Sequence, residues 1–226
     1  MKCFVFAMEK EAKPLLEESQ ILSSRKCGLS LLYEVEKDGV RFLVCVSGVG
    51  KGFAASAIAE ICLLHPEVEQ IINVGVGGSL DAEKAPLLSA VIASSFVEHD
   101  YDTSAFGDPI GYIWGLDLIN IPASKTINGS LELACKSLNV PCCLGVMASG
   151  DQFIVDEEKK KSLVKDFDAL SVDMESAPMA QIASSFGKEF AALRIVSDTG
   201  HKGEYEAFVH QAAGLAKKVI LAVLAQ

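Results

Sequence analysis

The chain has 226 residues, half of them hydrophobic, with a mean hydropathy of +0.32. This is enough apolar material for a sizeable core, and it excludes a largely disordered protein. The 20 basic and 30 acidic residues give a formal net charge of −10, which argues against nucleic acid and against an anionic membrane surface as partners.

The first apolar run extends from Cys3 to Met8, six residues, before charged residues follow. It is too short for the apolar region of a signal peptide and predicts a first strand instead. No later apolar stretch is expected to reach the length that spans a membrane, and residues 219–225 are interpreted as the end of an amphipathic helix. The seven cysteines form no CxxC pair, which predicts reduced, mostly buried thiols in a soluble, cytoplasmic protein.

Short runs rich in valine and isoleucine predict strands that are buried on both faces, at residues 3–8, 41–47, 70–76, 89–96, 142–148 and 190–197. Residues 32–36, followed by Lys37-Asp38-Gly39, predict a hairpin with the run that starts at Val40.

Helices are predicted between the strands, at about residues 10–19, 52–64, 128–138, 156–165, 174–186 and 205–224. Alternating strands and helices predict an α/β class protein, with a single-domain α/β/α sandwich around a mixed central β-sheet over residues 1–226.

Three acidic residues stand close to the ends of strands or the starts of helices: Glu11, Glu175 and Asp198. Ligands of open α/β sheets bind at the carboxyl ends of the strands, so these side chains are expected to converge on one cleft. Each of them, taken alone, is equally consistent with a helix cap or a partner of the helix dipole.

Two glycine-rich segments, residues 47–51 and 75–79, are expected to be turns after strands, where the backbone can approach a ligand closely. Neither has the spacing of a Walker A or a GxGxxG motif. A third segment, Ser149-Gly150-Asp151-Gln152-Phe153-Ile154, carries Phe153 beyond a strand. Phe153 is either a core residue or a stacking surface for an aromatic ligand.

In this order and spacing, seven motifs resemble the 5′-methylthioadenosine/S-adenosylhomocysteine nucleosidases of the purine nucleoside phosphorylase superfamily. The motifs are Ala7-Met8-Glu9-x-Glu11, Ser47-Gly48-Val49-Gly50-Lys51, Ile72-Asn73-Val74-Gly75, residues 99–107, Ser149-Gly150-Asp151-x-Phe153-Ile154, Val172-Asp173-Met174-Glu175 and Val196-Ser197-Asp198. The resemblance extends over nearly the whole chain and is weakest at about residues 108–138.

The resemblance implies a nucleoside phosphorylase-like fold, hydrolysis of the N-glycosidic bond and the following roles. Glu11 would deprotonate the attacking water, Glu175 would hold the ribose hydroxyls, and Asp198, positioned by Ser197, would protonate adenine N7. Further substrate contacts are implied for Met8, Val49, Val76, Gly77, Gly78, Phe153, Ile154, Met174, Tyr205 and Phe208. Phe106 would enter the site of a second subunit, which implies a homodimer. Neither a metal nor an organic cofactor is implied.

The reaction itself requires such an arrangement. Adenine leaves readily only when it is protonated, so a buried acid is needed near N7. The sugar develops positive charge, which nearby carboxylates stabilise, as in glycosidases. Water must attack the opposite face of the sugar, which requires the base to lie apart from the acid.

Two departures from the family pattern leave the substrate open. Val76 and Gly77 stand where a serine and an alanine are usual, and Asp173 stands where a glutamate is usual. An aminodeoxyfutalosine nucleosidase of menaquinone synthesis is therefore an alternative.

Two other classes compete. A purine nucleoside phosphorylase would need an arginine beside the glycine turn to hold phosphate, and residues 73–76 supply none. A non-catalytic nucleoside-binding protein could lack the acid or the base, whereas Glu11, Glu175 and Asp198 are all present. Fold resemblance alone would not decide for an enzyme.

Overall fold

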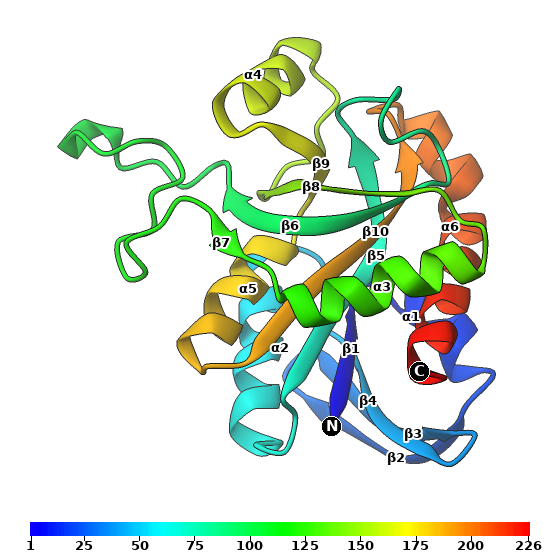
Figure 1. The fold of residues 1–226 in the computed structure, drawn as a ribbon. Helices are drawn as coiled ribbons and strands as arrows, with labels where there is room; N and C mark the ends of the chain where they lie inside the picture. Colours follow the sequence, from blue (N-terminus) through cyan, green and yellow to red (C-terminus); the bar gives the residue numbers. More distant parts are fainter.

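The computed structural model describes residues 1–226 and consists of one large sheet with helices packed around it (Figure 1). Its strands are β1 (Lys2–Phe6), β2 (Gln20–Cys27), β3 (Ser30–Lys37), β4 (Val40–Val46), β5 (Gln70–Ser79), β6 (Ala90–Glu98), β7 (Ile121–Pro122), β8 (Cys142–Ser149), β9 (Ala169–Asp173) and β10 (Glu189–Asp198). Its helices are α1 (Glu9–Leu16), α2 (Lys51–Leu64), α3 (Lys125–Ser137), α4 (Glu157–Phe167), α5 (Ser176–Ser185) and α6 (Lys202–Leu224), with a short 3-10 helix at Ser104–Phe106.

The helices cover both faces of the sheet, which explains why the strand sequences are apolar throughout. One hydrophobic cluster joins the sheet to α2 and α5, and a second joins it to α1, α3 and α6. In β1, Cys3 and Val5 belong to the first cluster, whereas Phe4 and Phe6 belong to the second. The α/β fold around a mixed central sheet, predicted from this lack of alternation, is confirmed.

The sheet is mixed and partly closed on itself. Its strand order is β10-β6-β8-β9-β5-β1-β4-β3-β2, and β10 additionally pairs with β5. The strands β5, β9, β8, β6 and β10 therefore form a closed ring, while β1 to β4 extend from it. In this ring, Gly78 of β5 lies opposite both Val172 of β9 and Asp198 of β10. The closure therefore brings together segments that are far apart in the sequence.

Three strands were missed by the sequence prediction: β2, β9 and the two-residue β7. All residues of β2 except Cys27 are exposed, and the strand pairs only with β3. It therefore lacks the apolar runs that mark a core strand. β9 has the sequence ALSVD and is only five residues long, too short for an apolar run to stand out.

The prediction that no apolar stretch approaches transmembrane length is wrong for α6. This helix of 23 residues contains an 18-residue window with a mean hydropathy of 1.4, so by length and composition it could cross a membrane. In the structure, seven of its residues are buried, among them Ala212, Val219 and Val223. They pack in the same cluster as α1 and α3, as the core helix of a globular domain does.

Between β6 and β7 the chain leaves the body of the protein. In Figure 1 this segment projects to the left, in green, and carries the 3-10 helix Ser104–Phe106. At its tip Phe106 is 82% exposed, and Trp114 is also exposed. Both large apolar side chains face solvent in the single chain.

The contact between β1 and β4 gives a test of the core. The rings of Phe4 and Phe42 are both fully buried and meet edge to face with centroids 5.6 Å apart. Phe4→Ala should reduce the free energy of unfolding by about 3–5 kcal/mol, because a buried ring is replaced by a cavity. Urea unfolding followed by circular dichroism measures this change.

The control is Leu29→Ala in the turn between β2 and β3, where Leu29 is 62% exposed. Its effect should stay within about 0.5 kcal/mol. Equal effects of the two substitutions would contradict the assignment of Phe4 to the core.

Candidate active site

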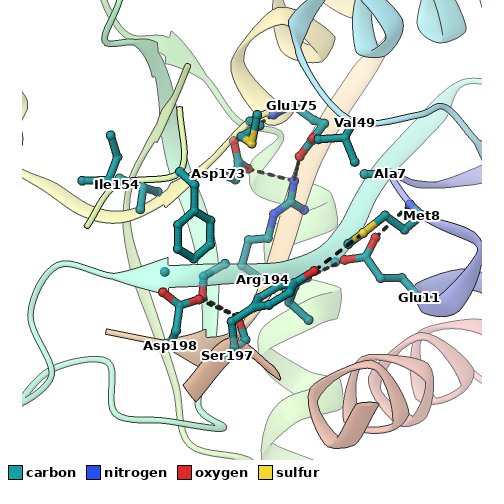
Figure 2. Close-up of a pocket in the computed structure, with 18 of the residues that line it drawn as sticks. Ala7, Met8, Glu11, Val49, Ile154, Asp173, Glu175, Arg194, Ser197 and Asp198 are labelled. Carbon is teal, nitrogen blue, oxygen red and sulfur yellow. Dashed lines mark hydrogen bonds and ion pairs between the residues drawn. The ribbon is translucent and has the colours of Figure 1, made fainter. Parts of the chain in front are cut away.

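A cavity of about 360 Å³ opens where the ends of β5, β9 and β10 meet the starts of α1, α2 and α6. Most of the residues predicted for the site line it (Figure 2): Met8, Glu11, Val49, Val76, Gly77, Gly78, Phe153, Ile154, Met174, Glu175, Ser197, Asp198 and Tyr205. The predicted convergence of three separated acidic residues on one cleft is therefore confirmed.

Glu11 lies in the first turn of α1, and backbone N–H groups fix both of its carboxylate oxygens. The N–H of Met8 donates to Oε2 at 3.0 Å, and the N–H of Val76 donates to Oε1 at 2.9 Å. Burial raises the pKa of Glu11, while the Val76 N–H and the charge of Arg194 oppose this shift. A buried carboxylate with an elevated pKa is suited to take a proton from water.

Asp198 ends β10 on another wall of the cavity, away from Glu11 (Figure 2). The hydroxyl of Ser197 donates to its Oδ2 at 2.9 Å, and the N–H of Gly200 donates to its Oδ1 at 2.9 Å. Both donors keep the carboxyl group in one orientation. Asp198 is buried in the protein but lines the cavity, so its side chain faces a ligand there rather than bulk water.

Glu175 precedes α5 and accepts a hydrogen bond from the glycine-rich segment 47–51. The N–H of Gly50, a residue with φ of +99°, donates to Glu175 Oε1 at 3.0 Å. A side chain is strained at this φ, so glycine allows the close approach. Burial and the neighbouring charge of Asp173 raise the pKa of Glu175 to about 7. Near neutral pH this carboxyl group therefore exchanges readily between its two protonation states.

Arg194 is the residue of the site that the sequence reasoning missed. It was interpreted as part of a buried strand, and it is 1% exposed, but it also lines the cavity. Its Nη2 donates to Asn73 Oδ1 at 2.5 Å and to Ser176 Oγ at 3.0 Å. The same nitrogen pairs with Asp173 at 2.8 Å and lies 3.8 Å from Glu175.

An arginine inside an apolar strand was the available signal, because such a charge is buried only when it is paired. The interpretation of Arg194 as a plain strand residue is therefore incomplete. Its guanidinium group is the cation that connects the acidic groups of the site.

The segment 75–79 was expected to be a turn and is instead the end of strand β5. Its glycines line the cavity and also make room for side chains of the site. A Cβ atom at Gly75 would lie 2.8 Å from Glu11 Oε1, and one at Gly77 would lie 3.1 Å from Arg194 Cβ. A side chain at either position would displace a residue of the site.

The apolar part of the cavity is formed by Phe153, Ile154, Val49 and the two methionines, Met8 and Met174. Phe153 is 48% exposed, so it is not an ordinary core residue. Its ring meets that of Tyr205 edge to face, with centroids 5.9 Å apart. One face of an aromatic ring is thus available for stacking on a flat ligand.

Two predicted residues lie elsewhere. Phe208 follows Tyr205 by about one turn of α6, so it lies on the same side of the helix but farther along its axis, and it does not line the cavity. Phe106 is on the projecting segment, away from the cavity of its own chain.

No histidine or cysteine lines the cavity. His65 caps the end of α2, and His201 is exposed at the start of α6. All seven cysteines are free, and Cys3, Cys45, Cys62 and Cys135 are buried, which confirms the prediction of mostly buried thiols. No group of three or more His, Cys, Asp or Glu side chains could hold a metal ion.

Known proteins resemble this chain over almost its whole length. A family model described as the phosphorylase superfamily matches residues 2–225. An aminodeoxyfutalosine nucleosidase of Helicobacter pylori is 28% identical, over 95% of this chain and 93% of its own length. A 5′-methylthioadenosine/S-adenosylhomocysteine nucleosidase of Geobacillus kaustophilus is 30% identical, over 83% of this chain and 80% of its own.

A crystal structure agrees with these relatives. The 5′-methylthioadenosine/S-adenosylhomocysteine nucleosidase from Helicobacter pylori, with butyl-thio-DADMe-Immucillin-A, superposes with a TM-score of 0.93. The two sequences are 27% identical, and the match covers 99% of this chain and 97% of the other. Fold and sequence therefore point to the same group of proteins.

The raised pKa of Glu175 predicts a pH-dependent effect on stability. The folded protein holds the proton of Glu175 up to about pH 7, whereas the ordinary pKa is 4.5. The contribution of Glu175 to the free energy of unfolding is therefore fully present below pH 4.5 and is lost as the pH rises through 7. Glu175→Gln removes this loss. Relative to wild type, the variant should gain on the order of 2–3 kcal/mol between pH 4.5 and pH 8, measured by urea unfolding.

Glu17→Gln on the exposed side of α1 is the control, and its effect should stay within about 0.5 kcal/mol at both pH values. A Glu175→Gln effect that is the same at pH 4.5 and pH 8 would show that folding does not raise the pKa of Glu175.

Proposed function

Since the chain belongs to the phosphorylase superfamily and is a nucleosidase, we propose that it hydrolyses 5′-methylthioadenosine and S-adenosylhomocysteine. The products would be adenine and either 5-methylthioribose or S-ribosylhomocysteine. One observation carries this proposal: the buried carboxyl groups of Glu11, Glu175 and Asp198 lie on separate walls of one cavity, beside the half-exposed ring of Phe153. Residues 1–226 act as one catalytic domain in this proposal.

Adenine binds at the end of the cavity formed by Phe153, Ile154 and Asp198. The ring of Phe153 stacks on the base, and backbone groups of Ile154 bind its edge. Asp198 donates a proton to N7, with Ser197 holding the carboxyl group in place through its hydroxyl at 2.9 Å. Protonation makes adenine a competent leaving group, and the electron pair of the glycosidic bond goes to the base.

The sugar lies between the base site and Glu11. Glu175 accepts hydrogen bonds from the ribose hydroxyls, and Met8, Met174 and Val49 pack against the ring. Val76 and Gly77 lie beneath the sugar, with Gly78 next to Asp198. As the bond to adenine breaks, the sugar becomes positively charged, and the surrounding carboxylates stabilise it.

The attacking nucleophile is a water molecule held by Glu11. Glu11 takes its proton, and the remaining hydroxide oxygen bonds to the anomeric carbon on the face opposite adenine. Val76, which stands where the family usually has serine, contributes its backbone N–H to this step by fixing Glu11 Oε1 at 2.9 Å. Loss of a serine hydroxyl at this position therefore leaves the orientation of the base intact.

The charges of the cavity favour water over phosphate as the nucleophile. Its wall contains Glu11, Asp173, Glu175 and Asp198, whereas its cations are Arg194 and Lys202. Arg194 is already paired with Asp173, and Lys202 with Glu206. A phosphate dianion would meet an excess of negative charge, so a purine nucleoside phosphorylase activity is disfavoured.

A second substrate is supported by the relatives. The aminodeoxyfutalosine nucleosidase of Helicobacter pylori is about as similar to this chain as the methylthioadenosine nucleosidases are. Aminodeoxyfutalosine contains the same adenine and ribose, with a longer arm at the 5′ position. The proposed chemistry at Asp198 and Glu11 would cleave it in the same way.

We also propose that the protein is a cytoplasmic homodimer. Seven free cysteines suit a reducing compartment. Phe106 is 82% exposed on the projecting segment, in position to reach a second copy of the chain. There it would complete the wall around the 5′ substituent.

The reaction is tested by adenine release from 5′-methylthioadenosine and S-adenosylhomocysteine in buffer without phosphate. Wild type should be active, and both Asp198→Asn and Glu11→Gln should lower kcat by about 10²-fold or more, since each removes a group that transfers a proton.

Glu17→Gln, an exposed substitution on the same helix as Glu11, is the matched control and should keep wild-type activity. A strict requirement for phosphate would refute hydrolysis, and full activity of Asp198→Asn would refute its role as proton donor.

The proposed dimer contact gives a separate prediction. Phe106→Ala should raise KM for 5′-methylthioadenosine about tenfold, because an apolar wall of the 5′ site is lost, with a smaller effect on kcat. Light scattering after size exclusion should give twice the mass of the chain. A monomer with full activity, or an unchanged KM in Phe106→Ala, would contradict a shared site.

A further inference from the structure

The 5′ end of the proposed substrate site carries a cation that the proposed reaction does not use. Lys10, in the first turn of α1, reaches across to α6 and donates to the hydroxyl of Tyr205 at 2.9 Å. Its Nζ also lies 4.8 Å from the centre of the Tyr205 ring. Tyr205 lines the cavity, so the ammonium group of Lys10 stands at the rim of the site.

The place of this pair relative to the substrate follows from the proposed function, on which the inference rests. Ile154 and Asp198 lie on one side of the cavity and Met8 on the other (Figure 2). With adenine on the first side, the 5′ substituent points toward Met8. The hydroxyl of Tyr205 lies 3.7 Å from Met8 Sδ, so Tyr205 and Lys10 adjoin the far end of that substituent.

The ammonium group of Lys10 has a phenol hydroxyl rather than a carboxylate as its hydrogen-bond partner. It takes part in none of the chain's ion pairs, whereas nearby acidic groups are engaged. Glu204 accepts hydrogen bonds from the N–H and hydroxyl of Thr199, and Glu206 pairs with Lys202 at 3.5 Å. A free ammonium and a phenol hydroxyl side by side can both donate to one carboxylate.

We propose that Lys10 and Tyr205 bind a carboxylate at the far end of the 5′ substituent, so that the enzyme prefers substrates whose arm ends in a carboxylate over 5′-methylthioadenosine. The arm must cross the apolar stretch beside Met8 before it reaches the two donors. S-Adenosylhomocysteine ends in an amino-acid carboxylate and aminodeoxyfutalosine in a benzoate, so both carry the required group. The neutral methylthio group of 5′-methylthioadenosine does not reach Lys10.

The test compares kcat/KM for adenine release from four substrates: 5′-methylthioadenosine, S-adenosylhomocysteine, its methyl ester, and aminodeoxyfutalosine. In wild type, kcat/KM should fall about tenfold from S-adenosylhomocysteine to its methyl ester, because the ester lacks the negative charge of the carboxylate. In Lys10→Met this ratio should approach one, and Lys10→Arg should restore most of it. The substrate with the higher kcat/KM identifies which arm, the amino acid or the benzoate, fits the site.

Lys13→Met is the matched control, since it removes the same charge from the same helix but at an exposed position paired with Glu17. In Lys13→Met, the ratio of kcat/KM for S-adenosylhomocysteine to kcat/KM for its methyl ester should equal that of wild type. Raising the salt concentration from 50 mM to 500 mM should lower the wild-type ratio and leave that of Lys10→Met unchanged, because salt screens the charge contact.

A purely structural role for Lys10, in which it only fastens α1 to α6, would lower kcat/KM for all four substrates by the same factor. That result, or equal kcat/KM for acid and ester in wild type, would overturn the inference while the nucleosidase reaction stands. Absence of adenine release from all four substrates by wild type would instead refute the proposed function.

Discussion

A single buried cation, Arg194, holds the site together. A guanidinium group taken out of water costs several kcal/mol unless it is paired and hydrogen-bonded. Here the partners come from three other elements: Asn73 of β5, Asp173 at the end of β9, and Ser176 at the start of α5. The closure of β10 on β5 is what allows these segments to reach Arg194, so the architecture of the ring and the electrostatics of the site depend on each other.

Arg194 alone does not neutralise all the acidic groups of the site, so an excess of negative charge remains. Asp173 accepts from Ser149, from the backbone of Glu175 and from Ser176, and these contacts hold it against Arg194 at 2.8 Å. Glu175, at 3.8 Å from the same nitrogen, receives less of this compensation. Burial and Asp173 therefore raise the pKa of Glu175 to about 7. An acidic cavity of this kind attracts a sugar that becomes positive and repels a second anion, which agrees with water rather than phosphate as the nucleophile.

Much of the fold and of the site could be predicted from the sequence, because the patterns that indicate them lie within short segments of the chain. Uniformly apolar runs gave most of the strands of the sheet, and acidic residues at strand ends predicted a common cleft. β2 could not be found because nearly all of its residues are exposed at the sheet edge. The glycines of β5 were misplaced in a turn, since their purpose is visible only when Glu11 and Arg194 are seen against them. Phe208 was assigned to the cavity by the family resemblance, but it lies one turn farther along α6 than Tyr205 and does not line the cavity.

The distribution of charge differs between the interior of the cavity and its rim, and the two regions have different roles in the proposed function. In the interior, carboxylates outnumber the one buried arginine, and this imbalance serves the breaking of the bond to adenine, a step common to every 5′-substituted adenosine. At the rim, Lys10 donates to Tyr205 and takes part in no ion pair. Its charge opposes, more weakly than that of Arg194, the rise in the pKa of Glu11 that burial causes. In the proposal it acts chiefly on whatever extends from the 5′ carbon, so the fold can keep one reaction while residues of α1 and α6 set which arm it accepts.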